Sequence, residues 1–276
     1  MNMLSSDIIS GVPITIKNVS KIFGEDTDKP FLALKAINAS INAGEFVSVV
    51  GASGCGKSTF MLIVAGLLSN TTGEIKVDGK LVSKPITDVG IAFQDHLLLE
   101  FRTAFKNVML QADIRGLPRI NIERRAKELF GQLKLEHAMN KYPRQLSGGM
   151  RQRVSLIRSL VHDPSLLLMD EPFGALDALT RLQVRTDLEA LWMRRRPTVV
   201  FITHSVEEAV GLSDRILVMS PSPGEVIDDI RVDLPRPRPI VLGDAPEFRK
   251  YVNRIHRHFE RLGVLTGVGA LPQSET

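Results

Sequence analysis

The feature that most constrains the fold is a glycine-rich loop between two apolar runs. Residues 45–50 are mostly apolar and β-branched, the next nine residues include three glycines, and residues 60–68 form the longest apolar run of the chain. This order predicts a buried strand, a loop and a helix. The N–H groups of such a loop and of the helix N-terminus converge on one point and favour a polyphosphate anion there. The sequence therefore predicts an α/β protein with a phosphate-binding loop.

The loop matches the pattern of a glycine, four further residues and then Gly-Lys-Ser. Its residues are Gly51, Ala52, Ser53, Gly54, Cys55, Gly56, Lys57, Ser58 and Thr59. We expect the Lys57 ammonium to reach the β- and γ-phosphates of a nucleotide, and the Ser58 hydroxyl to bind Mg²⁺. A plain glycine-rich turn is the alternative, but a chance match in a chain of this length has odds on the order of one in a hundred.

A second apolar run ends in two adjacent carboxylates. Residues 166–169 are apolar and lead into Asp170 and Glu171. A carboxylate at the end of a buried strand can hold Mg²⁺, directly or through water, and its neighbour can orient or deprotonate an attacking water. We assign the first role to Asp170 and the second to Glu171. Acidic residues also end buried strands for purely structural reasons. This pair therefore indicates a catalytic site only in combination with the phosphate loop.

Strand and helix patterns alternate over most of the chain. The ranges that predict strands are 12–16, 37–41, 45–50, 73–78, 88–93, 166–169, 198–203 and 215–219. The ranges with helical patterns are 103–162, 178–194 and 205–212. This alternation indicates a mostly parallel sheet, and the middle third of the chain is predicted to be a helical insertion.

The C-terminal part has a different character. Alternate prolines at 235–239 predict an extended linker, a basic helix is expected over 246–261, and residues 263–276 are expected to be loosely ordered. Residues 231–261 hold eight Lys or Arg and four Asp or Glu, which accounts for the whole net charge of +4. We interpret this basic segment as a solvated helix, with contact to anionic headgroups or to a partner subunit as the alternative.

The composition excludes several classes of protein. The chain is 43% hydrophobic and 24% charged, which is ordinary globular usage, and its small net charge does not favour nucleic acid as a partner. No apolar run is long enough to cross a bilayer, and no cleavable leader is recognisable. The single cysteine, Cys55, cannot form an intramolecular disulfide, so we expect a cytoplasmic setting. The chain has six histidines, and the five other than His204, which is discussed below, lack metal-ligand spacing, so no zinc site is expected.

A third motif decides the class of protein. Ser147, Gly148 and Gly149 precede a helical segment and offer a second helix N-terminus with exposed N–H groups. One nucleotide does not need two such cradles. With the phosphate loop, this signature and the acidic strand end in this order, residues 12–232 resemble the ATP-binding cassette (ABC) family. In that family the signature completes the nucleotide site of the opposite subunit in a head-to-tail dimer.

The resemblance implies roles for four further residues. Phe23 matches the aromatic that stacks on adenine, and Gln94 matches the glutamine that senses Mg²⁺ and the γ-phosphate. Asp177 matches the loop that contacts the other subunit, and His204 matches the histidine that holds the γ-phosphate and the attacking water. The structural alternatives are a core position for the phenylalanine and the histidine and an ordinary surface amide for the glutamine.

The resemblance also implies a fold and two cofactors. The fold is a phosphate-loop ATPase with a mostly parallel core sheet, an N-terminal antiparallel β subdomain and a helical subdomain inserted at about 95–165, followed by a linker, basic helix and tail over 233–276. The cofactors are ATP and Mg²⁺. The expected Mg²⁺ ligands are Ser58, Gln94 and Asp170.

Three segments, 94–103, 171–181 and 220–224, resemble importers of nitrate, sulfonate and taurine. Two departures are Glu100-Phe101, where that group commonly has Pro-Trp, and Met150, where many relatives have glutamine. The resemblance implies an ATP-hydrolysing subunit at the cytoplasmic face of the cell membrane. It would work with a second copy of itself, polytopic permease subunits and, indirectly, a solute-binding protein. A cassette ATPase that acts on a soluble macromolecular assembly is the alternative, and a regulatory module that binds ATP without hydrolysing it is the third.

Overall fold

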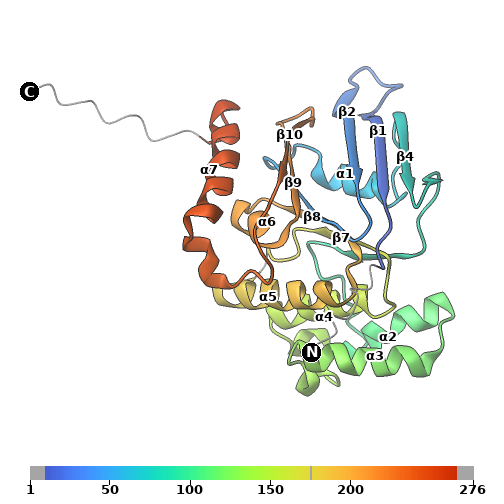
Figure 1. The fold of residues 1–276 in the computed structure, drawn as a ribbon. Coiled ribbons are helices and arrows are strands. Elements are labelled where there is room, and N and C mark those ends of the chain that lie inside the picture. The colour runs from blue at the N-terminus through green and yellow to red at the C-terminus, as the bar shows by residue number, and fades with distance from the viewer. Residues whose placement is uncertain (1–9, 175, 266–276) are drawn as a thin grey trace, which may run out of the picture.

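The structure is a computed structural model that describes residues 10–174 and 176–265, and its strands form two sheets (Figure 1). The larger sheet has the strand order β10-β9-β3-β8-β7-β6. Its strands are β3 (Phe46–Val50), β6 (Val89–Ala92), β7 (Leu166–Asp170), β8 (Thr198–Thr203), β9 (Arg215–Met219) and β10 (Val226–Arg231). All neighbours are parallel except β10, which runs antiparallel to β9. The predicted mostly parallel sheet is confirmed, with β10 as an additional strand.

The parallel strands end level with one another at one edge of the sheet. Val50 pairs with Thr203 across β3 and β8, and Asp170 pairs with Ile202 across β7 and β8. Every residue of β3 and β8 is buried, as expected for parallel strands covered on both faces. The segments that follow β3, β6, β7 and β8 therefore leave the sheet on the same side, where open α/β sheets bind their ligands.

The smaller sheet is antiparallel, with the order β2-β1-β4-β5. Its strands are β1 (Ile14–Phe23), β2 (Phe31–Ile41), β4 (Thr72–Val77) and β5 (Lys80–Leu81). β1 and β2 are longer than predicted, because their pairing continues up to the cross-strand pair of Phe23 and Phe31. The sequence pattern does not predict β5, which pairs with β4 over two residues.

The helix after the phosphate loop, α1 (Lys57–Val64), packs between the two sheets. Its Phe60 and Met61 belong to the same core cluster as buried residues of β1, β2, β3 and β8. The predicted helix spans 60–68, but α1 begins earlier and ends earlier. Gly66 follows it with a φ of 71°, and a Cβ there would lie 2.2 Å from the carbonyl oxygen of Lys84. This close approach ends the helix.

Residues 103–162, all of which the structure describes, contain helices and turns without a strand, as predicted. The elements are α2 (Ala104–Arg115), α3 (Arg119–Gln132), η1 (Glu136–Ala138), η2 (Pro143–Gln145) and α4 (Gly148–Leu160). They share a core of their own, to which α3 contributes Leu129 and Phe130 and α4 contributes Val154 and Ile157.

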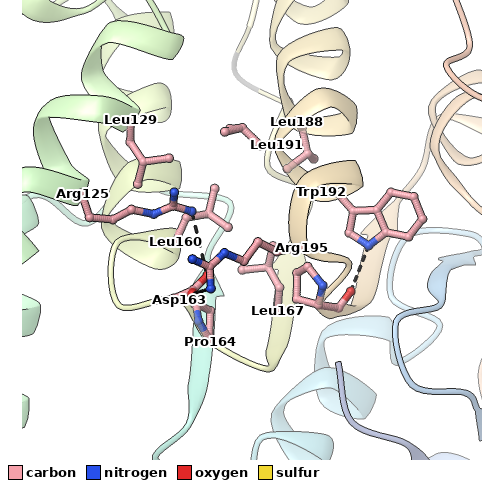
Figure 2. A pocket seen from close by; sticks show the side chains of 11 residues that line it. Arg125, Leu129, Leu160, Asp163, Pro164, Leu167, Leu188, Leu191, Trp192 and Arg195 are labelled. Atoms are coloured by element: carbon pink, nitrogen blue, oxygen red, sulfur yellow. Dashed lines mark hydrogen bonds and ion pairs between the residues drawn. The ribbon is translucent and has the colours of Figure 1, made fainter. Parts of the chain in front are cut away.

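Asp163 lies where this helical part meets α5 (Ala178–Arg195), as Figure 2 shows. Its carboxylate faces Arg125 of α3, with 3.9 Å between Oδ1 and Nη2, and also accepts a hydrogen bond from Arg195 of α5. Beside this pair, Trp192 Nε1 donates to the carbonyl of Pro197 at 2.9 Å. Two cations from different helices thus share one acid at the boundary between the helical part and the sheet.

The remaining helices cover the sheet near β10. They are α6 (Val206–Leu212), η3 (Ile240–Asp244) and α7 (Pro246–Arg261). The predicted terminal helix is confirmed as α7, and its Phe248, Ile255 and Phe259 pack into a cluster with residues of α6, β9 and β10. Part of the predicted loose tail, residues 266–276, lies outside the described residues. Within the described ranges, no helix is both long and apolar enough to span a membrane.

The interpretation of residues 231–261 as a solvated segment is wrong for two of its arginines. Arg238 is only 3% exposed, and its guanidinium donates to carbonyls at the end of α6 and after β10. Arg236 pairs with Glu189 of α5 and with Asp214, and it lies over the ring of Trp192. The physical reason is that the last carbonyls of a helix need donors, which the extended chain around 235–239 supplies.

Candidate functional site

The phosphate loop turns sharply between β3 and α1. Gly56 precedes α1 with a φ of 98°, and a Cβ there would lie 2.7 Å from Leu34 Cδ2. A Cβ on Gly51 would lie 2.8 Å from Cys55 Sγ. Both positions therefore require glycine. Because Gly56 has no side chain with which to cap α1, the N–H groups of the first turn remain available to an anion.

The Lys57 ammonium lies inside this loop. The residue is 5% exposed, and Nζ donates to the carbonyls of Gly51 at 3.0 Å and Ala52 at 2.9 Å. Burial raises the pKa of the neighbouring Cys55 thiol, although the nearby ammonium opposes this shift. The loop therefore holds a fixed cation beneath free backbone donors, which suits a polyphosphate.

An open pocket of about 340 Å³ joins the loop to the smaller sheet. Its lining residues are Phe23, Phe31, Ala33, Ser53, Gly54, Gly56, Lys57, Ser58, Thr59, Gln94 and Glu171. The structure thus brings together the predicted aromatic, the phosphate loop, the glutamine after β6 and the carboxylate after β7. An aromatic surface at one end and phosphate donors at the other fit a nucleotide.

Phe31 is a pocket residue that the sequence interpretation misses. It is 53% exposed, and Phe23, its cross-strand partner, is 39% exposed. The Lys21 ammonium lies 5.1 Å from the Phe23 ring centroid. The only sequence signal for Phe31 is an aromatic residue directly after an acidic loop, which by itself does not reveal the strand pairing.

The two carboxylates at the end of β7 have different surroundings. Burial raises the pKa of Asp170, while a hydrogen bond from Ser58 and the charge of Lys57 oppose this shift. The Ser58 hydroxyl therefore lies near the Asp170 carboxylate, and Gln94 lines the same pocket as Ser58. Oxygen donors of this kind are the ligands that Mg²⁺ prefers, with water and phosphate oxygens completing its shell. The residues fit the predicted ion.

Glu171 points instead to the residue after β8. Its Oε2 lies 3.1 Å from Nδ1 of His204, and its backbone N–H donates to the Ile202 carbonyl at 2.9 Å. The imidazole is accessible to solvent, because more than half of the His204 side chain is exposed. A carboxylate that accepts from one imidazole nitrogen leaves the other nitrogen available to a ligand. His204 and Asp170 do not themselves line the pocket; each contacts a residue that does.

The signature residues and Asp177 do not line this pocket. Ser147 Oγ caps α4 by accepting from the N–H of Met150 at 3.2 Å, and Asp177 Oδ1 caps α5 by accepting from the N–H of Thr180 at 3.0 Å. Hydrogen bonding from the Thr180 side chain, and then from its N–H, lowers the pKa of Asp177. A Cβ on Gly149 would lie 2.8 Å from Thr180 Cγ2, so the two helices begin side by side. Ser147, Gly148, Gly149 and Asp177 therefore form a second group of residues, apart from the phosphate loop of the same chain.

Comparison with known proteins agrees with this arrangement. Residues 34–174 match the family model described as ABC transporter. An uncharacterized ABC transporter ATP-binding protein of Methanocaldococcus jannaschii is 42% identical over 244 residues, which cover 88% of this chain and 91% of the relative. The aliphatic sulfonates import ATP-binding protein SsuB of Bacillus cereus is 38% identical over 252 residues, which cover 91% of this chain and 98% of the relative.

Solved structures give the same result. The dimeric structure of MJ0796, a bacterial ABC transporter cassette, superimposes with a TM-score of 0.71 at 33% identity and covers 79% of this chain and 98% of that one. A post-hydrolysis state of that cassette, bound to ADP and Pi, gives a TM-score of 0.69. With a family model that matches half of its length and relatives that align along most of it, the chain belongs to the ABC transporter family of ATP hydrolases.

Proposed function

We propose that this protein is the ATP-hydrolysing subunit of an importer for a small anion, such as an aliphatic sulfonate, taurine or nitrate. The observation that carries the proposal is the single pocket in which the phosphate loop, Gln94 and Glu171 meet. The similarity to SsuB, an aliphatic sulfonates import protein, supports import and an anionic solute. The subunit would lie at the cytoplasmic face of the cell membrane and would serve a solute-binding protein indirectly.

The residues in and beside the pocket divide the tasks of the proposed hydrolysis of ATP. The loop N–H groups and Lys57 bind the phosphates, and Phe23 stacks on the adenine. Mg²⁺, held by Ser58, Asp170 and Gln94, supplies positive charge to the phosphate oxygens when it is bound. Glu171 accepts the proton of the attacking water, and His204 holds that water and the γ-phosphate in line.

Residues 147–149 and Asp177 are proposed to serve the site of a second copy. Their position outside the pocket of their own chain supports this role. Two copies arranged head to tail would place each α4 N-terminus against the phosphates held by the other chain. The dimeric cassette among the solved relatives supports such an assembly.

The segment after Gln94 is proposed to contact the permease. Leu97 is exposed, and Phe101 is 75% exposed, so this segment presents two large apolar side chains to a partner. Asn107 bonds to both backbone groups of Leu99, and Arg158 of α4 donates to the carbonyls of His96 and Leu97. A movement of α4 would therefore be transmitted to this apolar surface.

We propose residues 12–232 as the catalytic domain, with 95–165 as its helical subdomain and 233–276 as an appendage.

Co-purification tests the proposal. The tagged chain is recovered from mildly solubilised membranes of its own cells, and its partners are identified by mass spectrometry. A polytopic membrane protein in stoichiometric amount, lost when Phe101 is replaced by Glu but retained with the distant Leu81→Glu, is the expected result. Recovery from the soluble fraction with ribosomes or assembly factors would leave the ATPase standing and overturn the transport function.

A further inference from the structure

A buried carboxylate, that of Glu208, contacts the residue that precedes His204. Glu208 belongs to α6, and its side chain is 10% exposed. Its Oε2 accepts a hydrogen bond from Thr203 Oγ1 at 2.5 Å, and its Oε1 lies 3.7 Å from Nε of Arg181. One carboxylate thus contacts the end of β8 with one oxygen and the beginning of α5 with the other.

The contact with Thr203 fixes the backbone on both sides of His204. The Thr203 hydroxyl accepts the N–H of Ser205 at 3.0 Å, while it donates to Glu208. The Ser205 hydroxyl in turn accepts the N–H of Glu208 at 3.2 Å. His204 is therefore the central residue of a turn that is closed by three hydrogen bonds.

The contact with Arg181 extends to the loop before α5. Arg181 Nη2 donates to the carbonyl of Leu176 at 3.0 Å. The next residue, Asp177, caps α5, and this loop is the one proposed to face a second copy of the chain. A continuous series of contacts therefore runs from Leu176 through Arg181, Glu208 and Thr203 to the turn that holds His204.

This arrangement is not needed merely to pack α6. Burial raises the pKa of Glu208, which means that the ionised carboxylate is held at an energetic cost. Thr203, Arg181, His204 and Arg185 oppose that shift. A well-packed apolar residue would attach the helix without removing a charge from water, so the retained charge is explained better by a requirement for defined geometry.

We propose that Glu208 is a positioning residue, which holds His204 in register with Glu171 and couples both to the loop at Leu176 and Asp177. The inference rests on the roles proposed above for His204 and Glu171. Glu208 itself touches neither ATP nor the attacking water, so it would act entirely through the histidine.

The test compares Glu208→Gln with Glu207→Gln in the full-length chain. The glutamine keeps the size of the side chain but removes its charge, which weakens the contact with Arg181 and the hydrogen bond from Thr203. We expect kcat for ATP hydrolysis to fall about tenfold, while KM and ATP binding stay within about twofold of wild type. Glu207 is exposed on the same turn of α6 and accepts a hydrogen bond from the Ser205 hydroxyl but does not contact Thr203 or Arg181, so its variant is the matched control.

A second step separates positioning from general destabilisation. In a His204→Ala background, measured by single-turnover hydrolysis at high enzyme concentration, Glu208→Gln should cause no further loss, because the residue through which it acts is already gone. A further tenfold loss in that background, or wild-type kcat for Glu208→Gln, would overturn the inference. If Glu208→Gln does not fold, Arg181→Gln, at a half-exposed position, is expected to show the same dependence on His204.

The two proposals fail in different ways. Wild-type turnover of His204→Ala itself would refute the role assigned to the histidine. Strongly reduced turnover of His204→Ala together with unchanged turnover of Glu208→Gln would leave the catalytic assignment intact and remove only the coupling through Glu208.

Discussion

The imidazole Nδ1 of His204 lies 3.1 Å from Oε2 of Glu171, and the two residues follow neighbouring strands of the parallel sheet. Glu171 has a φ of 44°, a conformation that costs a residue other than glycine on the order of 1 kcal/mol. Its N–H bond to the Ile202 carbonyl keeps it there. The chain thus maintains a strained backbone at the position where this carboxylate and imidazole meet, as is common at catalytic sites.

Glu171→Gln should retain ATP binding but lose turnover by at least about a hundredfold, because the amide cannot take a proton from water while the phosphate loop is unchanged. Steady-state phosphate release and fluorescent nucleotide binding measure the two properties. Glu123→Gln, which removes only a surface pair with Lys127, is the control. Wild-type turnover would refute the assignment of the general base.

Ser147→Arg should abolish hydrolysis in a pure preparation and leave ATP binding to the isolated chain, because this serine is proposed to serve the site of the neighbouring copy. Lys57→Ala should abolish hydrolysis by damaging its own site. Mixing the two inactive proteins should restore activity, since a mixed dimer contains one site with an intact loop and an intact signature. A mixture that stays inactive, although the chains form mixed dimers, would argue against the head-to-tail arrangement.

Phe31→Ala should weaken ATP binding by about 1 kcal/mol, or about fivefold in Kd, if the ring of Phe31 contacts the base as Phe23 is proposed to do. Leu81→Ala removes an exposed apolar side chain from the same sheet, far along the strand order, and should have no effect. Equal Kd values for Phe31→Ala and wild type would restrict the stacking role to Phe23.

Arg238→Ala should lower the free energy of unfolding by about 3 kcal/mol, because four backbone carbonyls lose their donors in a buried site. Arg249→Ala, which removes an exposed pair with Asp244, should change it by less than about 0.5 kcal/mol. Urea unfolding of both variants provides the measurement. Equal midpoints would show that the C-terminal segment contributes little to stability.

His162 should make stability fall on acidification. Burial, with Arg115 as a smaller contribution, lowers its pKa to about 4. In the unfolded chain the imidazole binds a proton near pH 6.5, so the unfolded state binds more protons than the folded state between these values. The free energy of unfolding therefore falls by at most about 3 kcal/mol as the pH falls from 6.5 to 4. We expect His162→Gln to flatten this dependence in urea unfolding at pH 7 and pH 4.5.

The sequence predicts the parallel sheet and the phosphate loop well, because both depend on local patterns. Strand β8 is a continuous apolar run that ends at His204, and the loop needs its glycines at fixed positions. The expected residues Gln94, Glu171 and Lys57 share a pocket for the same reason: each directly follows a parallel strand or the loop after one. The helical middle third is equally visible in its spacing of apolar residues.

The features that the sequence does not reveal depend on distant partners. β10 contains Asp228 and Asp229, which discourage a strand assignment, yet Asp228 binds Arg254 and His258 of α7 and Asp229 binds Arg215 of β9. Phe31 becomes a site residue only through its pairing with Phe23. The buried guanidinium of Arg238 is hidden in the same way, because a proline-rich stretch gives no sign of the carbonyls that it will meet.

The contacts of Arg236 and Arg238 also have a consequence for synthesis of the protein. Glu189 and the end of α6 leave the ribosome before the arginines that neutralise or cap them. The sheet can form earlier, but this side of it stays incomplete until the chain beyond residue 239 has emerged. A nascent chain stalled before Arg236 and Arg238 have emerged would therefore present the Glu189 carboxylate and the carbonyls at the end of α6 to chaperones and proteases without these partners.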